Sequence, residues 1–243
     1  MTGDTPFVPR LVSVVIPTWN RSERLLGAAI ESVLAQTVPE LELVVVDDGS
    51  DVVASPFVDT YGDPVRCHRQ DNRGLGAARN AGVHEATGEF LAFLDSDDVW
   101  APDKLSSQLA ALDADPDLEA VFGRAEQFYD EEVDDEYRRR HPIKDPLVDA
   151  YLSSAMLIRR TSFDRIGPYD EEHRNGADID WFLRARENHL RTLMLPATVY
   201  HRRLHESNIS ITESTANQNR LLALKRSLDR RRASGDPSVG GND

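Results

Sequence analysis

The sequence predicts an α/β fold in which a doubly wound, mostly parallel sheet is flanked by helices. Short, continuous apolar runs, typical of strands buried on both faces, alternate along the chain with segments of helical periodicity. Three of these runs, ending at Ile16, Val46 and Leu94, lead directly into polar loops. Ligands bind at the carboxyl ends of strands in such sheets, so these loops are the expected site. With 243 residues, 40% of them hydrophobic, the chain can bury one sizeable core or two small ones.

The first half of the chain contains the regular elements. Leu11 to Ile16 is an apolar run that ends at Pro17, and the helical pattern that follows can be capped by Ser22 or Asn20. Further apolar runs and a helix rich in small residues continue the alternation of strand and helix. The elements predicted here are strands over 11–16, 41–46, 65–69 and 90–94 and helices over 22–36 and 76–86.

The second half is less regular. A helix is predicted from Asp103 to about Leu112, a strand over 153–158 and a helix over 179–187. Between them, Asp113 to Tyr137 contains many acidic residues, and its dense run 130–136 is interpreted as a solvated loop or helix face.

The two ends of the chain carry less information. Residues 1–10 are predicted to be an N-terminal extension and residues 234–243 a disordered tail. Residues 212–233 are predicted to form a basic amphipathic helix, with an apolar stripe formed by Leu221, Leu222, Leu224 and Leu228. Such a helix suits contact with a membrane surface, but packing on its own domain is the commoner fate.

Charge and composition exclude several classes of function. The 42 acidic residues exceed the 28 basic ones, giving a net charge of −14 that disfavours nucleic acid as a partner. The single cysteine, Cys67, fits a reducing compartment. We find neither the basic flank and apolar run of a secretory signal nor a transmembrane stretch. A cytoplasmic location is therefore predicted, with peripheral contact at the inner face of the membrane as a variant.

A carboxylate cluster, Asp95-Ser96-Asp97-Asp98, directly follows the apolar run 90–94. Carboxylates repel one another unless a cation compensates them, and Mg²⁺ or Mn²⁺ typically binds one or two carboxylates together with phosphate oxygens. The cluster therefore indicates a metal and diphosphate site. The alternative is an ordinary helix start capped by Asp98.

Two other polar segments favour a nucleotide. In Asp47-Asp48-Gly49-Ser50, the carboxylate of Asp48 can bind a ribose hydroxyl, although a simple Asx turn is the alternative. Residues 72–80 combine glycines with Arg73 and Arg79 at a helix start, which suits a diphosphate, or else only a turn. The chain lacks both the GxGxxG fingerprint after its first strand and a GxxxxGK[ST] loop.

The joint order of these segments resembles the family 2 glycosyltransferases, which have the glycosyltransferase A fold. The matching segments are VSVVIPTWNR, LELVVVDDGS, NRGLGAARNAG and GEFLAFLDSDDVWAPDKL, and more loosely NGADIDWFLRAR and YHRRLHESNIS. The resemblance spans Val12 to about Ser210. It implies an inverting transferase that uses a nucleotide-diphosphate sugar and Mn²⁺ or Mg²⁺, with residues 11–100 binding the donor and 101–211 the acceptor.

The resemblance also implies roles for individual residues. Nucleobase and ribose would contact Pro17, Thr18, Asn20 and Asp48. The base or diphosphate would lie near Arg79 or Arg73. Asp97 is similar to the ribose- or metal-contacting acid and Asp98 to the metal ligand, while Asp95 supports them. The late His205 resembles a further metal ligand and fits the pattern better than His201.

An inverting transfer also needs a base. The family commonly has an acidic pair before an aromatic-rich helix, and here Ala177 replaces the first acid while Asp178 keeps the position of the second. Asp178 is therefore the predicted base, with Asp180 in reserve. The alternative is that both acids only favour a helix N-terminus.

The sequence thus predicts transfer of a sugar, most plausibly from a UDP-sugar, to a hydroxyl-bearing acceptor. The acceptor is a glycan, a lipid-linked molecule, a peptide or a small molecule. Two alternatives remain, a nucleotidyltransferase of similar fold and a non-catalytic module that binds sugar nucleotides or glycans.

Overall fold

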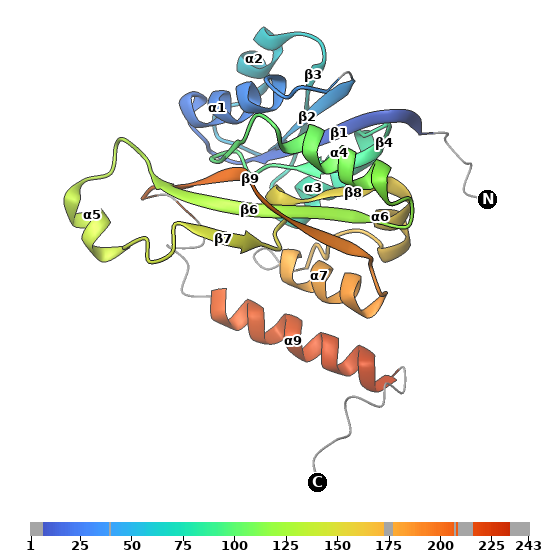
Figure 1. Cartoon of the computed structure of the whole chain (residues 1–243). Coiled ribbons are helices and arrows are strands. Elements are labelled where there is room, and N and C mark those ends of the chain that lie inside the picture. The colour runs from blue at the N-terminus through green and yellow to red at the C-terminus, as the bar shows by residue number, and fades with distance from the viewer. Residues whose placement is uncertain (1–6, 39, 173–176, 207, 209–215, 234–243) are drawn as a thin grey trace.

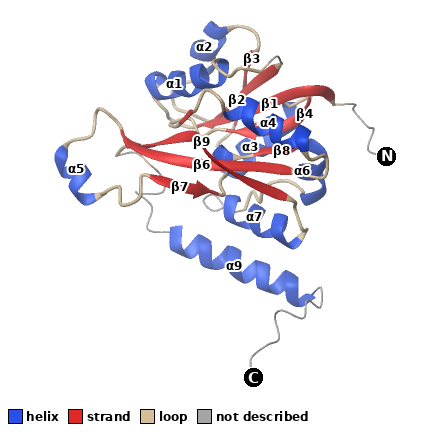
Figure 2. Ribbon diagram, viewed as in Figure 1, coloured by secondary structure: helices blue, strands red, loops and turns tan. Residues whose placement is uncertain are grey.

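A single sheet organises the molecule. The computed structural model describes residues 7–38, 40–172, 177–206, 208 and 216–233. Within these ranges the sheet has nine strands in the order β3-β2-β1-β4-β8-β6-β9-β5, with β7 pairing β6 (Figure 1). Helices lie on both sides of the strands (Figure 2). The predicted α/β class is confirmed.

The first half has the predicted strand and helix order. Its elements are β1 (Val8–Thr18), α1 (Glu23–Leu34), β2 (Leu41–Asp48), α2 (Ser55–Val58), η1 (Asp59–Tyr61), β3 (Val65–Gln70), α3 (Leu75–Glu85) and β4 (Gly88–Phe93). The strands β1, β2, β3 and β4 pair in parallel. Their carboxyl ends therefore meet at one edge of the sheet, where the loops after β1, β2 and β4 come together.

The alternation of side chains along β1 explains the two layers of helices. Val14 and Ile16 pack toward α1 and α4 (Lys104–Ala114), whereas Val15 packs toward α3 and α7 (Ala177–Glu187). On the second face α3 approaches β1 closely, since a Cβ at Gly82 would lie 2.2 Å from Cγ1 of Val15. A residue larger than glycine at position 82 would push α3 away from the sheet.

The second half completes the sheet. Its further elements are β5 (Val99–Trp100), β6 (Ala120–Tyr129), α5 (Asp135–Arg140), β7 (Leu147–Ala150), η2 (Ser153–Ala155), β8 (Leu157–Arg159), α6 (Arg160–Ile166) and β9 (Thr192–Leu204). The long strands β6 and β9 are parallel to each other, and β8 joins β6 to β4 by antiparallel pairing. One sheet therefore runs through both predicted halves.

The dense acidic run is a loop that leads into the helix α5, and its acidic residues are exposed, so the interpretation as a solvated loop or helix face holds except at Asp130. The strand β6 lies within 113–137, because the acidic residues gather before and after it while its own apolar residues fill the middle of the sheet. Asp130 is buried rather than solvated. Its carboxylate forms hydrogen bonds with Arg24 Nη2 at 2.9 Å and Arg203 Nη1 at 3.0 Å, tying α1 to β9.

The C-terminal helix α9 (Ala216–Ala233) packs on the domain, as predicted, but through a different face. Ala223 and Ser227 are buried, whereas Leu224 and Leu228 are 43% and 42% exposed. The side chains of Leu221 and Leu222 lie outside the described part, as do residues 234–243. Ion pairs made by the helix's arginines determine which face turns inward. No helix in the described part of the chain combines the length and apolar character that crossing a bilayer requires.

Candidate active site

The loops after β1 and β2 are fastened to each other. Asn20, in the left-handed region with φ 47°, donates from Nδ2 to Asp51 Oδ2 at 3.0 Å and accepts the Asp51 N–H at Oδ1, 2.7 Å away. The Asn20 N–H also donates to Ser50 Oγ at 2.9 Å. Pro17 and Thr18 are the buried last residues of β1 and pair with β2. The predicted nucleotide loop is thus a stiff double loop at the sheet edge.

The acid pair after β2 organises the adjacent turns. Asp47 accepts the backbone N–H groups of Ser50 and Ala54 at 2.9 and 3.1 Å, three and seven residues further on, so its carboxylate fixes the loop after β2. The two oxygens of Asp48 accept the N–H groups of Arg73 and Gly74 at 2.9 and 2.8 Å. The Asp48 carboxylate therefore fixes the turn that leads into α3.

Beyond β4, Asp97 and Asp98 are buried in different electrostatic surroundings. Oδ2 of Asp97 lies 3.0 Å from His205 Nε2 and 3.0 Å from Arg21 Nη2. Burial acts to raise the pKa of Asp97, but the hydrogen bond to His205 and the charge of Arg21 lower it. Burial and the neighbouring carboxylates Asp97 and Asp95 hold the pKa of Asp98 well above its ordinary value.

Asp98 also connects the cluster to β9. Its Oδ1 accepts the N–H of Arg203 at 2.8 Å, and Arg203 Nε donates to the carbonyl of Asp97 at 3.0 Å. These bonds fix the strand end that presents His205, two residues further along the chain. His201 lies apart, with Nδ1 3.1 Å from Glu126 Oε2. Of the two late histidines, His205 is the one beside the carboxylates.

The guanidinium of Arg79 links the end of β4 to the start of α7. Arg79 lies on α3 and is fully buried, with Nη2 2.8 Å from Asp95 Oδ1 and Nη1 2.8 Å from Asp178 Oδ2. Although burial lowers it, the pKa of Arg79 is raised overall by Asp178 and Asp95. The group therefore stays charged between the end of β4 and the start of α7, at the base of the carboxylate cluster.

Two hydroxyl groups orient Asp178 further. Ser153 Oγ donates to Asp178 Oδ1 and lies 2.8 Å from the Tyr169 hydroxyl oxygen. The Tyr169 ring in turn stands under the Arg79 guanidinium, 5.3 Å from centroid to Cζ. Asp178 is therefore contacted from α3 by Arg79 and from η2 by Ser153, and Tyr169, after α6, contacts both of these residues.

Two predicted site residues have other partners. Asp180 is buried, with its oxygens 2.8 Å from Arg184 Nε and 3.0 Å from Arg230 Nη1. Arg73 is exposed and its Nη2 lies 2.5 Å from Glu171 Oε2. The structure brings Asp95, Asp97, Asp98, His205, Arg79 and Asp178 into connected contacts, and it leaves Asp180 and Arg73 outside that set.

Sequence reasoning missed Arg21, Ser153 and Tyr169. Arg21 ends the matched segment VSVVIPTWNR, so its place in the loop after β1 could have suggested a role near the carboxylates. Ser153 and Tyr169 stand in segments without a readable motif, and only the packing of η2 against α7 reveals them.

Comparisons with known proteins agree with this arrangement. A family model for glycosyl transferase family 2 matches residues 13–170. An uncharacterized glycosyltransferase of Nostoc sp. is 48% identical over 99 residues, which are 39% of this chain and 30% of that protein. One of Rickettsia typhi is 30% identical over 184 residues, which are 71% of this chain and 58% of that protein. This chain therefore spans less than two thirds of either relative.

A solved structure supports the fold. The crystal structure of S. aureus TarS 1-349 in complex with UDP-GlcNAc matches with a TM-score of 0.71 at 23% identity, covering 90% of this chain and 65% of that one. This similarity confirms the predicted glycosyltransferase A fold. Together with the family model, which covers more than half of the sequence, it shows that this chain belongs to glycosyl transferase family 2.

Proposed function

We propose that this chain transfers a sugar from a UDP-sugar to a hydroxyl-bearing acceptor with inversion at the anomeric carbon. The observation that carries the proposal is the double ion pair of Arg79, which joins Asp95 of the predicted donor site to Asp178. A donor and an acceptor bound on either side of this cluster would meet beside Asp178. The complexes of TarS with UDP-GlcNAc and UDP support the choice of uridine nucleotide.

Asp178 is the proposed general base. It takes the proton of the acceptor hydroxyl as that oxygen bonds to the anomeric carbon, while the bond from this carbon to the diphosphate breaks and its electron pair leaves with UDP. A single displacement of this kind inverts the configuration. Arg79 and Ser153 each hold one oxygen of Asp178, so the carboxylate keeps one orientation toward the acceptor.

The residues fit a divalent cation bound together with the donor. No set of three or more His, Cys, Asp or Glu side chains in the described ranges is arranged to hold a metal ion by itself. Asp97 and His205 nevertheless adjoin at 3.0 Å, and Mg²⁺ or Mn²⁺ commonly combines one or two protein ligands with substrate phosphate oxygens. The raised pKa of Asp98 reflects buried negative charge that a cation would offset. Held by Asp97 and His205, such an ion would supply positive charge beside the departing diphosphate.

The other donor contacts are proposed to be partly indirect. The side chain of Asn20 forms hydrogen bonds with the loop after β2, and that of Asp48 accepts hydrogen bonds from the turn before α3. We therefore assign them the shaping of the nucleotide pocket whose walls include Pro17 and Thr18. Arg73 is exposed beside the same turn, where its charge would attract the diphosphate.

Binding and turnover, measured separately, test the proposal. Isothermal titration with UDP, with and without Mn²⁺, is expected to show binding that needs Mn²⁺ and is lost in an Asp97→Asn/Asp98→Asn variant. UDP release from a panel of UDP-sugars, with glycan, lipid-linked, peptide and small-molecule acceptors, measures turnover. The surface variant Asp115→Asn serves as the control, since this carboxylate lies at the end of α4, where it contacts Arg191 and accepts the Asp117 N–H. Binding without release under every condition would favour the binding module. Consumption of a nucleoside triphosphate with a sugar phosphate would favour the nucleotidyltransferase.

A further inference from the structure

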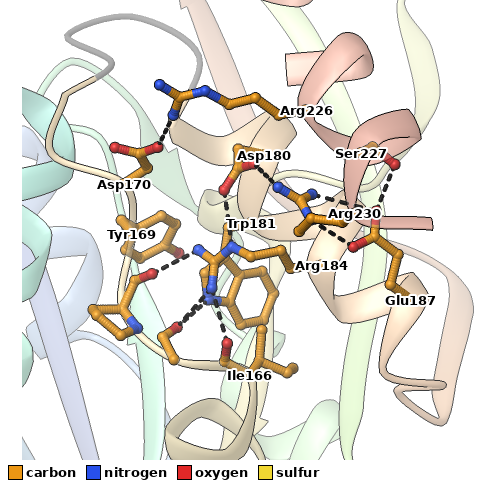
Figure 3. Close-up of polar contacts among 12 residues, drawn as sticks. Ile166, Tyr169, Asp170, Asp180, Trp181, Arg184, Glu187, Arg226, Ser227 and Arg230 are labelled. Atoms are coloured by element: carbon orange, nitrogen blue, oxygen red, sulfur yellow. Dashed lines mark hydrogen bonds and ion pairs between the residues drawn. The ribbon is translucent and has the colours of Figure 1, made fainter. Parts of the chain in front are cut away.

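The C-terminal helix α9 makes a specific polar interface with α7. Arg230 Nη1 lies 3.0 Å from Asp180 Oδ1, and Arg230 Nε lies 2.7 Å from Glu187 Oε2. Ser227, buried one turn earlier, donates from Oγ to Glu187 Oε1 at 2.5 Å. Figure 3 shows these side chains converging from the two helices. α9 therefore contacts α7 at two places, Asp180 near the beginning of α7 and Glu187 at the end of α7.

A second arginine of α9 reaches the chain before α7. Arg226 Nη1 contacts Asp170 Oδ2 (Figure 3). Arg226 Nη2 also lies 3.0 Å from Glu172 Oε2. Arg226 and Arg230 are one helical turn apart, so they lie on one face of α9. Their acidic partners occur on both sides of Asp178 in the sequence. One face of α9 thus fixes the chain before and after the proposed base.

The contacts continue from Asp180 into the molecule. Arg184, the second partner of Asp180, donates from Nη1 to the carbonyl of Ile166 at 2.8 Å and from Nη2 to that of Pro168 at 2.6 Å. Trp181 Nε1 donates to the carbonyl of Gly167 at 2.9 Å (Figure 3). Three successive carbonyls at the end of α6 are therefore tied to α7 by two side chains.

This turn leads directly to the residues that hold Asp178. Tyr169 follows it, packs against the Trp181 ring at 5.8 Å between centroids, and places its hydroxyl 2.8 Å from Ser153 Oγ. Ser153 donates to Asp178. An unbroken path of contacts thus joins Arg230 to the proposed base, running through Asp180, Arg184, the 166–168 turn, Tyr169 and Ser153.

Burial makes the first link of this path costly to break. Asp180 is buried, and while burial acts to raise its pKa, the hydrogen bonds from Arg184 and Arg230 lower it. Loss of Arg230 would leave one oxygen of a buried carboxylate without its cation, so the start of α7 would have to move toward solvent.

We infer that α9 is a positioning element of the active site, in which Arg230 and Arg226 act through Asp180 and Asp170 to fix Asp178. This inference rests on the proposed role of Asp178 as the base. Neither arginine contacts the carboxylate cluster directly in the described contacts. They are positioning residues, and their loss is expected to slow the chemical step while leaving binding of UDP with Mn²⁺ intact.

The test compares Arg230→Ala and Arg226→Ala/Arg230→Ala with the conservative Arg230→Lys and the matched control Arg232→Ala. Arg232 is on the same helix, and its side chain is 68% exposed beside Asp229. Because small displacements of a catalytic group can cost up to about 100-fold in rate, we expect the alanine variants to lose about 10- to 100-fold in kcat for UDP release. The Kd for UDP with Mn²⁺ should stay within about twofold of the wild-type value. Arg230→Lys should recover part of kcat, and Arg232→Ala should match the wild type.

Hydrogen exchange gives a readout that does not depend on activity. Residues 177–187 should exchange faster in Arg230→Ala, and exchange at β1 and β2 should not change. In a double-mutant cycle, Asp178→Asn/Arg230→Ala should be no slower than Asp178→Asn alone, because Arg230 acts only through Asp178.

The inference would be overturned if kcat were unchanged in Arg226→Ala/Arg230→Ala, or if the losses in kcat were additive in the double-mutant cycle with Asp178→Asn. A parallel loss of UDP affinity and melting temperature would also overturn it. Failure of the proposed function is seen separately, as absence of UDP release from the wild-type protein. Even if the wild-type protein released no UDP, unchanged hydrogen exchange of residues 177–187 in Arg230→Ala would overturn the proposed coupling between α9 and α7.

Discussion

Arg79 and Asp178 form an ion pair with 2.8 Å between Nη1 and Oδ2, although one lies on α3 and the other on α7. The same guanidinium lies 2.8 Å from Asp95 at the end of β4. Since Arg79 is fully buried, neither carboxylate can be separated from it without exposing a charge to the apolar interior. Because both pair with the buried Arg79, the distance between the carboxylates of Asp95 and Asp178 is set by the core of the protein and not by flexible loops.

Replacement of Arg79 is expected to destabilise the protein strongly. Arg79→Ala leaves Asp95 and Asp178 without their shared cation; because these side chains are 41% and 23% exposed, we expect a cost of about 2–3 kcal/mol, less than the roughly 3–5 kcal/mol of a fully buried pair. Urea unfolding followed by circular dichroism measures the change in free energy of unfolding. Arg73→Ala, which removes an exposed arginine near the same helix, is the control and should cost less than about 1 kcal/mol. Equal losses in the two variants would contradict the buried hub.

Ser153→Ala tests the orientation of the proposed base. The substitution removes the hydroxyl that donates to Asp178 but leaves Arg79 in place, so we expect kcat for UDP release to fall about tenfold with little change in UDP affinity. Steady-state kinetics over a range of UDP-sugar concentrations separates the two effects. Ser107→Ala, on α4, is the matched control. A loss confined to KM would show that Ser153 serves donor binding instead.

Asp130 is expected to contribute stability that depends on pH. Burial acts to raise its pKa, but hydrogen bonds from Arg24, from the Glu132 N–H and from Arg203 lower it. A lowered folded pKa gives stability that is fully present above the unfolded value of about 3.9 and is lost as the pH falls through the folded value.

The Asp130→Asn variant should therefore have a lower melting temperature than the wild type at pH 7, and the difference should shrink as the pH falls below about 3.9. Differential scanning calorimetry across this range measures it. A difference independent of pH would mean that the carboxylate charge is not what stabilises the contact between α1 and β9.

The exposed leucines of α9 are expected to contribute little to folding. Leu224→Gln/Leu228→Gln should change the free energy of unfolding by no more than about 0.5 kcal/mol per site, because both side chains face solvent. Ala223→Leu, on the buried face, should instead loosen α9 from the domain, since its side chain is fully buried. Thermal unfolding of both variants decides which face of the helix packs, and a larger loss from the glutamine variant would reverse the assignment.

The sequence predicted the first half of the fold well because its strands are buried on both faces. A continuous run such as 43–46 has no reason to be apolar throughout unless helices cover both sides of the sheet. The strand β6 was not predicted, because the many acidic residues of 113–137 drew attention away from the apolar residues between them. Most of these acidic residues lie before or after the strand. Asp130 shows the same limit, since pairing with Arg24 and Arg203 depends on contacts distant in sequence.

The candidate site was predicted in its composition more than in its connections. The motif order singled out Asp95, Asp97 and Asp178; in the structure Arg79 joins Asp95 to Asp178, whereas Asp97 contacts His205 and Arg21. No local pattern could show that Asp180 turns toward α9, because its two arginine partners are assembled only by helix packing. The order of motifs along the chain thus indicates which side chains gather at the sheet edge, whereas their individual contacts depend on packing that the sequence does not display.

UDP release by Asp178→Asn, measured beside UDP binding in the presence of Mn²⁺, tests the central claim most directly. The substitution removes the proposed base and keeps the shape of the side chain, so we expect kcat to fall by about 10²- to 10⁴-fold while the Kd for UDP stays at the wild-type value. A variant that binds UDP normally and releases it from the UDP-sugar at the wild-type rate would contradict the account, because the base would then have to be another group.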